Sequence, residues 1–184
     1  MADPNPMSKD GKTPMHLAAL NGHADICSLI ADHTSNPNQG DMFGNTPLHE
    51  AARRGHTEVY QEIMDLVEDK NPARSDSGIT PLHLSAENGH YALTRLILEQ
   101  TKDHCPRDRV GNNTPMELAA KKGHLEICIL FKKRPNRLCS PPQGKNIWFF
   151  LPGQSGRQTF FSCTTYSTPI KQRAPQEYGA LNFA

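Results

Sequence analysis

One eleven-residue phrase occurs four times in the chain, and its spacing constrains the fold more than any other feature. It reads TPMHLAALNGH from residue 13, TPLHEAARRGH from 46, TPLHLSAENGH from 80 and TPMELAAKKGH from 114. The Thr-Pro pairs recur at steps of 33, 34 and 34 residues, and the closing Gly-His pairs keep the same steps. Two independent markers that share one period indicate an array of structural repeats.

Each phrase carries the residues that begin and end a short helix. Threonine is a favoured N-cap, and the proline after it fits the first helical position, where a missing N–H costs nothing. The small residues in the middle let a neighbouring backbone come close, and the glycine is typical of a left-handed residue after a helix. A helix of about nine residues is marginal alone, so it needs a packing partner.

An amphipathic segment follows each phrase and predicts a second helix. Its apolar residues fall in two registers four residues apart, which we expect to face the first helix and the next repeat. The first register holds Ile26, Val59, Leu93 and Ile127, and the second holds Ile30, Ile63, Ile97 and Phe131. Linkers rich in Pro, Asn, Asp and Gly close each unit. No unit can bury its apolar face alone, so neighbouring units must stack.

The phrase, the period and the helix pair resemble the ankyrin repeat. The resemblance implies an all-α solenoid of stacked helix–turn–helix units with hairpin-like finger loops between them. It covers residues 3–137, which divide into repeats at 3–35, 36–69, 70–103 and 104–137. Glu117 departs from the pattern by replacing a His, Glu50 by replacing a Leu and Asn112 by replacing a Gly, although Asn tolerates a left-handed backbone. Proline in the linkers predicts loose finger hairpins.

Composition and charge indicate in which cellular compartment the chain is expected and which partners it is not expected to bind. The net charge of +1 creates no field that would attract nucleic acid or an anionic membrane. The five cysteines form no CxxC pair and no even framework, which favours a reducing compartment. No signal-peptide core and no run of 18 apolar residues occurs, so no membrane insertion is expected. We predict a cytoplasmic or nuclear protein that is a monomer and binds no nucleic acid.

The basic run at residues 132–137 has two interpretations. It could be a patch for nucleic acid or nuclear import, or a charged helix C-terminus that complements the helix dipole. Residues 1–137 hold 16 basic and 18 acidic residues, which favours the helix terminus.

The repeated histidines have a metal-binding and a scaffold interpretation. His16, His49 and His83 recur on matching helices, but packed helices lie about 8–10 Å apart. Zinc ligands lie about 2.0–2.1 Å from their ion, so successive repeats cannot share one. The resemblance implies instead that these histidines hold the Thr-Pro turn, and that the four Gly-His histidines order the interhelical loop. No GxSxG, P-loop or HExxH motif occurs, so we expect no metal, no cofactor and no enzymatic activity.

Recognition of a protein partner is the function that remains. The resemblance implies a partner bound across a concave face made of finger tips and first helices. Positions that differ among the repeats, while the scaffold letters stay fixed, mark this surface, and Arg and aromatic residues are frequent interface hot spots. The predicted partner-binding residues are Met42, Phe43, Asn45, Arg53, Arg54, Thr57, Ile79, Glu87, Asn88, Tyr91, Arg109, Lys121 and Lys122.

We therefore predict a non-catalytic scaffold or adaptor that binds an unidentified protein. The alternative is an N-terminal or truncated regulatory fragment of a larger ankyrin-repeat protein, such as a channel or ubiquitin-ligase subunit.

Residues 138–184 do not continue the repeat. The next Thr-Pro pair is due at 147–148, where the chain reads Ile-Trp, and eight of the twelve aromatic residues lie in this tail. In one interpretation residues 146–151 fold back as a cap on the last repeat, because three adjacent aromatic side chains are costly to leave in water. In the other the tail is disordered, or a product of splicing or gene prediction. We predict a largely irregular tail with docking at 146–151.

Overall fold

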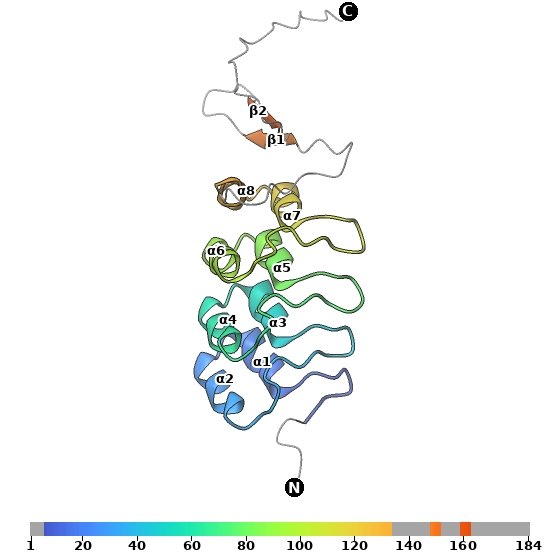
Figure 1. Cartoon of the computed structure of the whole chain (residues 1–184), viewed down its shortest axis with the longest axis vertical. Coiled ribbons are helices and arrows are strands. Elements are labelled where there is room, and N and C mark those ends of the chain that lie inside the picture. The colour runs from blue at the N-terminus through green and yellow to red at the C-terminus, as the bar shows by residue number, and fades with distance from the viewer. Residues whose placement is uncertain (1–5, 134–147, 152–158, 163–184) are drawn as a thin grey trace, which may run out of the picture.

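The computed structural model describes residues 6–133, 148–151 and 159–162. Residues 6–133 form four helix pairs stacked in chain order (Figure 1). The first helices of the pairs are α1 (Pro14–Asn21), α3 (Pro47–Arg54), α5 (Pro81–Glu87) and α7 (Pro115–Lys122). The second helices are α2 (Ala24–Ala31), α4 (Thr57–Met64), α6 (Tyr91–Gln100) and α8 (Leu125–Lys132). The loops between repeats extend to the side of the first helices, where their finger-like ends project away from the second helices (Figure 1).

The first helices begin and end where the sequence predicts. Each has an N-cap Thr in extended conformation and a Pro in its first turn. A glycine in the left-handed region, with φ between +79° and +81°, follows directly after α1, α3 and α7 and one residue later, after Asn88, in the third repeat. Because these signals are local, they could be read without knowledge of the tertiary structure.

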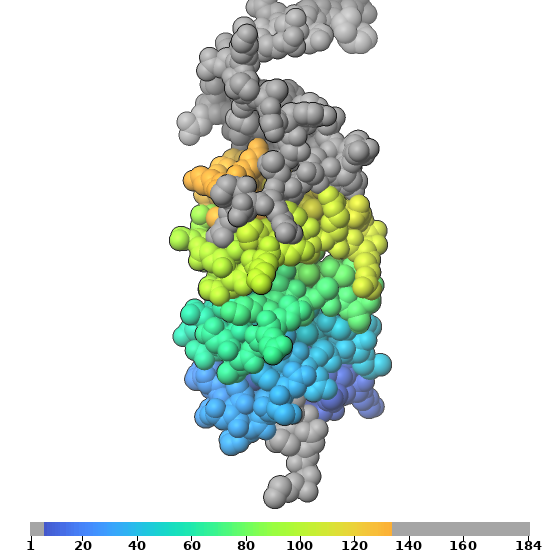
Figure 2. Space-filling view, in the orientation of Figure 1, coloured from blue at the N-terminus to red at the C-terminus, as the bar shows by residue number. Residues whose placement is uncertain are grey.

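The core lies between the two helix layers and between neighbouring repeats. First helices pack on first helices, and second helices pack on second helices, along the whole array. Small residues at the first-helix contacts are buried, as at Ala19, Ala52 and Ala86, all 0 % exposed. The space-filling view shows the four repeats as one continuous column (Figure 2).

The prediction that the first apolar register of the second helices faces the next repeat is wrong. The register of Val59, Leu93 and Ile127 is at most 1 % exposed, whereas Ile26 of the first repeat is 44 % exposed. The register therefore faces the preceding repeat, not the next one. Helical periodicity places residues on one face of a helix, but it does not say on which side the neighbour stands.

The finger loops are closed, which corrects the prediction of loose hairpins. We use this name for residues 8–12, 41–45, 74–79 and 108–113. A backbone hydrogen bond joins the ends of each loop at 2.7–3.0 Å, as from the Asp41 amide to the Asn45 carbonyl. Asn112 takes the left-handed conformation expected of it, with φ of +52°. Neighbouring fingers are also joined, since the Met42 amide donates to the Asp10 carbonyl and the Arg109 amide to the Ser77 carbonyl.

Two short strands, β1 (Trp148–Leu151) and β2 (Thr159–Ser162), lie within the tail and pair antiparallel. Phe149 is opposite Phe161 and Phe150 is opposite Phe160. The sequence shows no sustained alternation here and did not predict this hairpin. Residues 134–147 lie outside the described part of the chain, so the cap at 146–151 stays a prediction. In the described residues no helix is long and apolar enough to span a bilayer.

Candidate protein-binding surface

Three histidines of the Thr-Pro-x-His turns join each repeat to the next. The backbone N–H of Thr46 donates to Nδ1 of His49 at 3.1 Å, and Nε2 of His49 lies 3.1 Å from the Ile79 carbonyl in the next finger. His16 and His83 make the same contacts, to the Asn45 and Asn113 carbonyls. Because a backbone N–H only donates and a carbonyl only accepts, these rings are neutral, with the proton on Nε2.

The environment of these rings favours the neutral state. Burial lowers the pKa of His49 to about 4, although the hydrogen bond to the Ile79 carbonyl acts in the opposite direction. Burial likewise lowers the pKa values of His16 and His83. In the fourth repeat Glu117 takes this place, and its Oε1 is buried with no hydrogen-bond partner among the described residues. The histidines are therefore scaffold groups that fix the finger loops on the helices.

The Gly-His histidines make a second set of contacts, to the preceding repeat. Nε2 of His56, His90 and His124 lies 2.9–3.2 Å from the carbonyls of Leu20, Arg53 and Glu87, respectively. No group of three or more metal-ligating side chains occurs in the described part of the chain. Cys27 is also structural, since it is 1 % exposed and burial raises its pKa to about 11, which keeps the thiol protonated.

Buried aspartates organise two of the finger loops. Oδ1 of Asp41 accepts hydrogen bonds from the amides of Phe43 and Asn45 at 2.9 and 2.8 Å, and Oδ2 accepts from the Asn45 side chain. Asp108 binds Asn113 and the Gly111 amide in the same way in the fourth finger. Burial opposes the charge on Asp108, but these hydrogen bonds outweigh it and hold its pKa below the usual value. The loops that present Phe43 and Val110 are thus fixed by internal anions.

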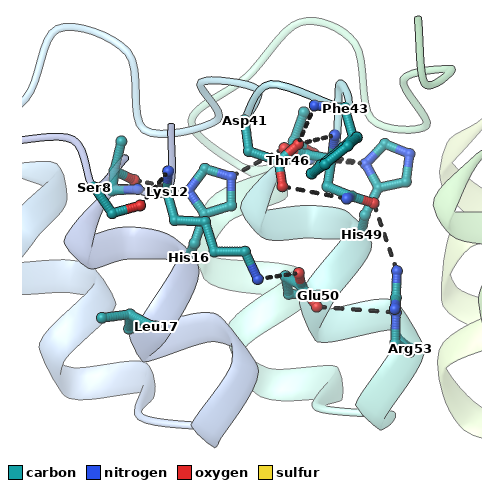
Figure 3. A network of polar contacts seen from close by, with 12 residues as sticks. Ser8, Lys12, His16, Leu17, Asp41, Phe43, Thr46, His49, Glu50 and Arg53 are labelled. Atoms are coloured by element: carbon teal, nitrogen blue, oxygen red, sulfur yellow. Dashed lines mark hydrogen bonds and ion pairs between the residues drawn. The ribbon is translucent and has the colours of Figure 1, made fainter. Parts of the chain in front are cut away.

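A polar network connects the first finger, α3 and the second finger (Figure 3). Glu50 is 4 % exposed and lies between Lys12, at 3.4 Å, and Arg53, at 3.9 Å. Arg53 also reaches Oδ1 of Asn45 at 3.5 Å. The cations of this network remain at the surface, whereas the carboxylate is enclosed beneath them.

The fourth repeat copies part of this arrangement and the third does not. Nζ of Lys121 donates to Oδ1 of Asn113 at 2.5 Å, in the geometry of Arg53 and Asn45. The third repeat has Ile79 and Glu87 at these two positions, and Glu87 pairs with Lys122 at 3.6 Å. The first-helix ends therefore alternate between basic, acidic and basic from repeat two to repeat four.

The predicted binding residues divide into two surfaces and one internal group. Thr57 and Tyr91 begin second helices and line a groove of about 330 Å³ between α4 and α6, away from the finger loops. Asn45 is only 8 % exposed and Ile79 is half-buried, so both belong largely to the scaffold. The other residues lie on finger loops and the ends of first helices: Met42, Phe43, Arg53, Arg54, Glu87, Asn88, Arg109, Lys121 and Lys122.

Sequence reasoning missed the buried acids beneath this surface. In the sequence Glu50 is only a departure from Leu, and no pattern predicts that Asp41 and Asp108 are buried. The signal available was the recurrence of Asp a few residues before the Asn-Thr-Pro stretch in repeats two and four. Burial of these groups depends on contacts between finger and helix that are not visible in one repeat.

Comparison with protein families agrees with this architecture. The family model for ankyrin repeats, a unit of three copies, matches residues 1–74 and 63–137. The chain therefore belongs to the ankyrin-repeat family, and members of this family generally bind other proteins. No curated protein matches the chain.

Proposed function

We propose that this chain is a non-catalytic scaffold or adaptor that binds a protein partner across its inner surface. The inner surface comprises the finger loops and the first helices, residues 6–21, 41–54, 74–88 and 107–122. The outer surface comprises the second helices and the linkers, residues 24–40, 57–73, 91–106 and 125–133. A cytoplasmic or nuclear location belongs to the same proposal.

Exposed apolar side chains on fixed finger loops support the proposal most directly. Met42, Phe43 and Val110 are 71 %, 55 % and 80 % exposed. The loop hydrogen bonds to Asp41 and Asp108 hold the backbone of these residues, so little further ordering is needed on binding. Arg53 and Arg54 lie at the end of α3 in the same repeat as Phe43, and this mixture of aromatic and arginine residues is typical of interface hot spots.

The test is affinity capture with the full chain and two paired variants. Met42→Ala with Phe43→Ala removes apolar surface from the second finger. Leu29→Ala with Leu66→Ala is the matched control, since these outer-surface leucines are 65 % and 55 % exposed. We expect the finger variant to lose the captured partner and the control to retain it. Retention of every partner by the finger variant, and by Arg53→Ala with Arg54→Ala, would place binding elsewhere.

A further inference from the structure

We propose that the partner segment bound at the inner surface is an extended acidic peptide with two acidic clusters separated by about five neutral residues. This inference rests on the proposed function and adds the chemistry of the partner. It is carried by the distribution of charge between the two surfaces of the array.

The two surfaces differ in charge although the whole chain is nearly neutral. The inner surface holds nine basic and seven acidic residues, and the outer surface holds five basic and ten acidic residues. The net charges are therefore +2 on the inner surface and −5 on the outer surface. An acidic segment is attracted to the first and repelled by the second.

Burial of acidic side chains makes the solvent-accessible part of the inner surface more basic than its net charge indicates. Four of its seven acids are enclosed, since Asp41, Glu50, Asp108 and Glu117 are 3–8 % exposed. The accessible acids are Asp10, Asp76 and Glu87, of which Asp76 pairs with Arg74 at 2.9 Å and Glu87 with Lys122 at 3.6 Å.

Several inner-surface cations have no such partner. Arg54, Arg109 and Lys121 are exposed, and no described carboxylate lies within 4.0 Å of them. Their hydrogen bonds to neutral groups, such as Lys121 to Asn113 and Arg109 to the Ser75 carbonyl, orient the side chains without neutralising them. These cations are available to carboxylates of a partner.

The positions of the cations determine the spacing in the peptide. Arg53 and Arg54 end α3, and Lys121 and Lys122 end α7, with α5 between them. Two helix spacings of about 8–10 Å separate these pairs. An extended chain advances about 3.3 Å per residue, so five or six residues cover this distance.

The third repeat favours a peptide over a nucleic acid. It places Glu87 and Asn88 between the two basic pairs, and Asp76 on its finger. A nucleic-acid strand carries a charge about every 3.4 Å and would meet these carboxylates with phosphates. A peptide can place neutral or apolar residues there, opposite the half-buried Ile79.

Fluorescence anisotropy with the full chain tests this inference. The probe is a labelled peptide with two Glu-Asp pairs separated by five neutral residues. One comparison peptide has the four acids adjacent, a second has lysines in place of the acids, and a single-stranded oligonucleotide of four phosphates is the nucleic-acid comparison. The variant Arg54→Glu with Lys121→Glu reverses two unpaired inner cations. Lys102→Glu with Lys132→Glu makes the same change in net charge on the outer surface, also at a helix C-terminus.

We expect the spaced acidic peptide to bind the parent chain more tightly than the three comparison ligands do. The inner variant should weaken this binding by about tenfold, because two ion pairs are lost and two repulsions are created. The outer variant should weaken it by less than about threefold, because its charges lie beyond the contact range of the peptide.

The outcomes separate this inference from the proposed function. If the inner variant bound the peptide as the parent does, or the oligonucleotide bound as tightly as the peptide, the acidic-peptide inference would be overturned. If the Met42 and Phe43 variant lost its captured partner while the inner charge variant kept it, the inner surface would still be the binding surface. Only the acidic chemistry of the partner would then be refuted.

Discussion

Replacement of Gly55 by alanine should destabilise the array far more than its backbone conformation alone requires. Gly55 ends α3 with φ of +79°, and the imidazole of His90 from the next repeat lies against it. A Cβ at residue 55 would lie 2.7 Å from Cε1 of His90, closer than van der Waals contact allows. The ring would have to move away from the Arg53 carbonyl, to which Nε2 is hydrogen-bonded at 3.1 Å.

The expected loss in the free energy of unfolding for Gly55→Ala is the sum of three contributions. A left-handed alanine costs about 1–2 kcal/mol. Overpacking against a fixed ring adds about 1–3 kcal/mol, and a lost hydrogen bond about 0.5–1.5 kcal/mol. Gly123 gives the comparison, because its φ is +81° and, apart from its neighbours in the chain, no described atom lies within 4 Å of its Cβ position. Gly123→Ala should therefore cost only the conformational term, about 2 kcal/mol less than Gly55→Ala.

Urea denaturation followed by circular dichroism measures both variants. Gly123 lies in the last described repeat, where unfolding can be local, so a double-mutant cycle with His90→Ala supplies the stricter comparison. Removal of the ring should make Gly55→Ala about 2 kcal/mol less costly than in the parent. If the cost of Gly55→Ala were the same with and without His90, the ring contact would not be the reason for glycine at this position.

Three further outcomes are expected. The pKa of His49 is about 4 in the folded chain and about 6.5 in the unfolded chain. Between these two pH values the unfolded chain binds more protons than the folded chain, so the free energy of unfolding should fall as pH drops from 6.5 towards 4. Between pH 7.5 and pH 5 the loss from His49 is about 2 kcal/mol in urea titrations, and equal stability at both pH values would contradict the neutral-ring assignment. Glu50→Leu should leave the urea midpoint unchanged or raise it, because the desolvation cost of the buried carboxylate is removed and the two cations left behind, Lys12 and Arg53, are partly exposed to water. It should also tighten binding of the spaced acidic peptide by releasing Lys12 and Arg53, and weaker binding would argue against the charge analysis. Removal of residues 146–184 should lower the melting midpoint if the tail caps the array, and an unchanged midpoint with unchanged solubility would exclude the cap.

The parts of the fold that can be predicted are those determined by interactions between residues close together in the sequence. Thr-Pro at a helix start, glycine after its end and asparagine at a left-handed finger position each act within a few residues. The repeat of these signals gave the helix pairs and their order. The closed fingers are not predictable from the linkers, since proline there predicts weak pairing. The closing hydrogen bonds lie within residues 74–79 and 108–113, after those prolines.

The parts that were not predictable depend on contacts between repeats. Ile26 and Val59 occupy one register, yet one is 44 % exposed and the other 1 %. The difference comes from the presence of α2 beside α4, which no single repeat encodes. The enclosed state of Glu50 has the same origin, since it needs Lys12 from one repeat and Arg53 from the next.

Variation among the repeats also has two physical sources, which sequence alone does not separate. Some variable positions contact each other: Asn45 is hydrogen-bonded to Arg53 and Asn113 to Lys121, whereas repeat three has Ile79 and Glu87 at these two positions. A change of residue at one of these two positions is compensated by a change at the other. This explains why Asn45 differs from Ile79 although Asn45 is buried. Other positions differ while their side chains project to solvent, as at Met42, Phe43 and Arg54. Variation at these solvent-exposed positions is not required by a contact within the array. It is therefore the better indicator of what the array binds.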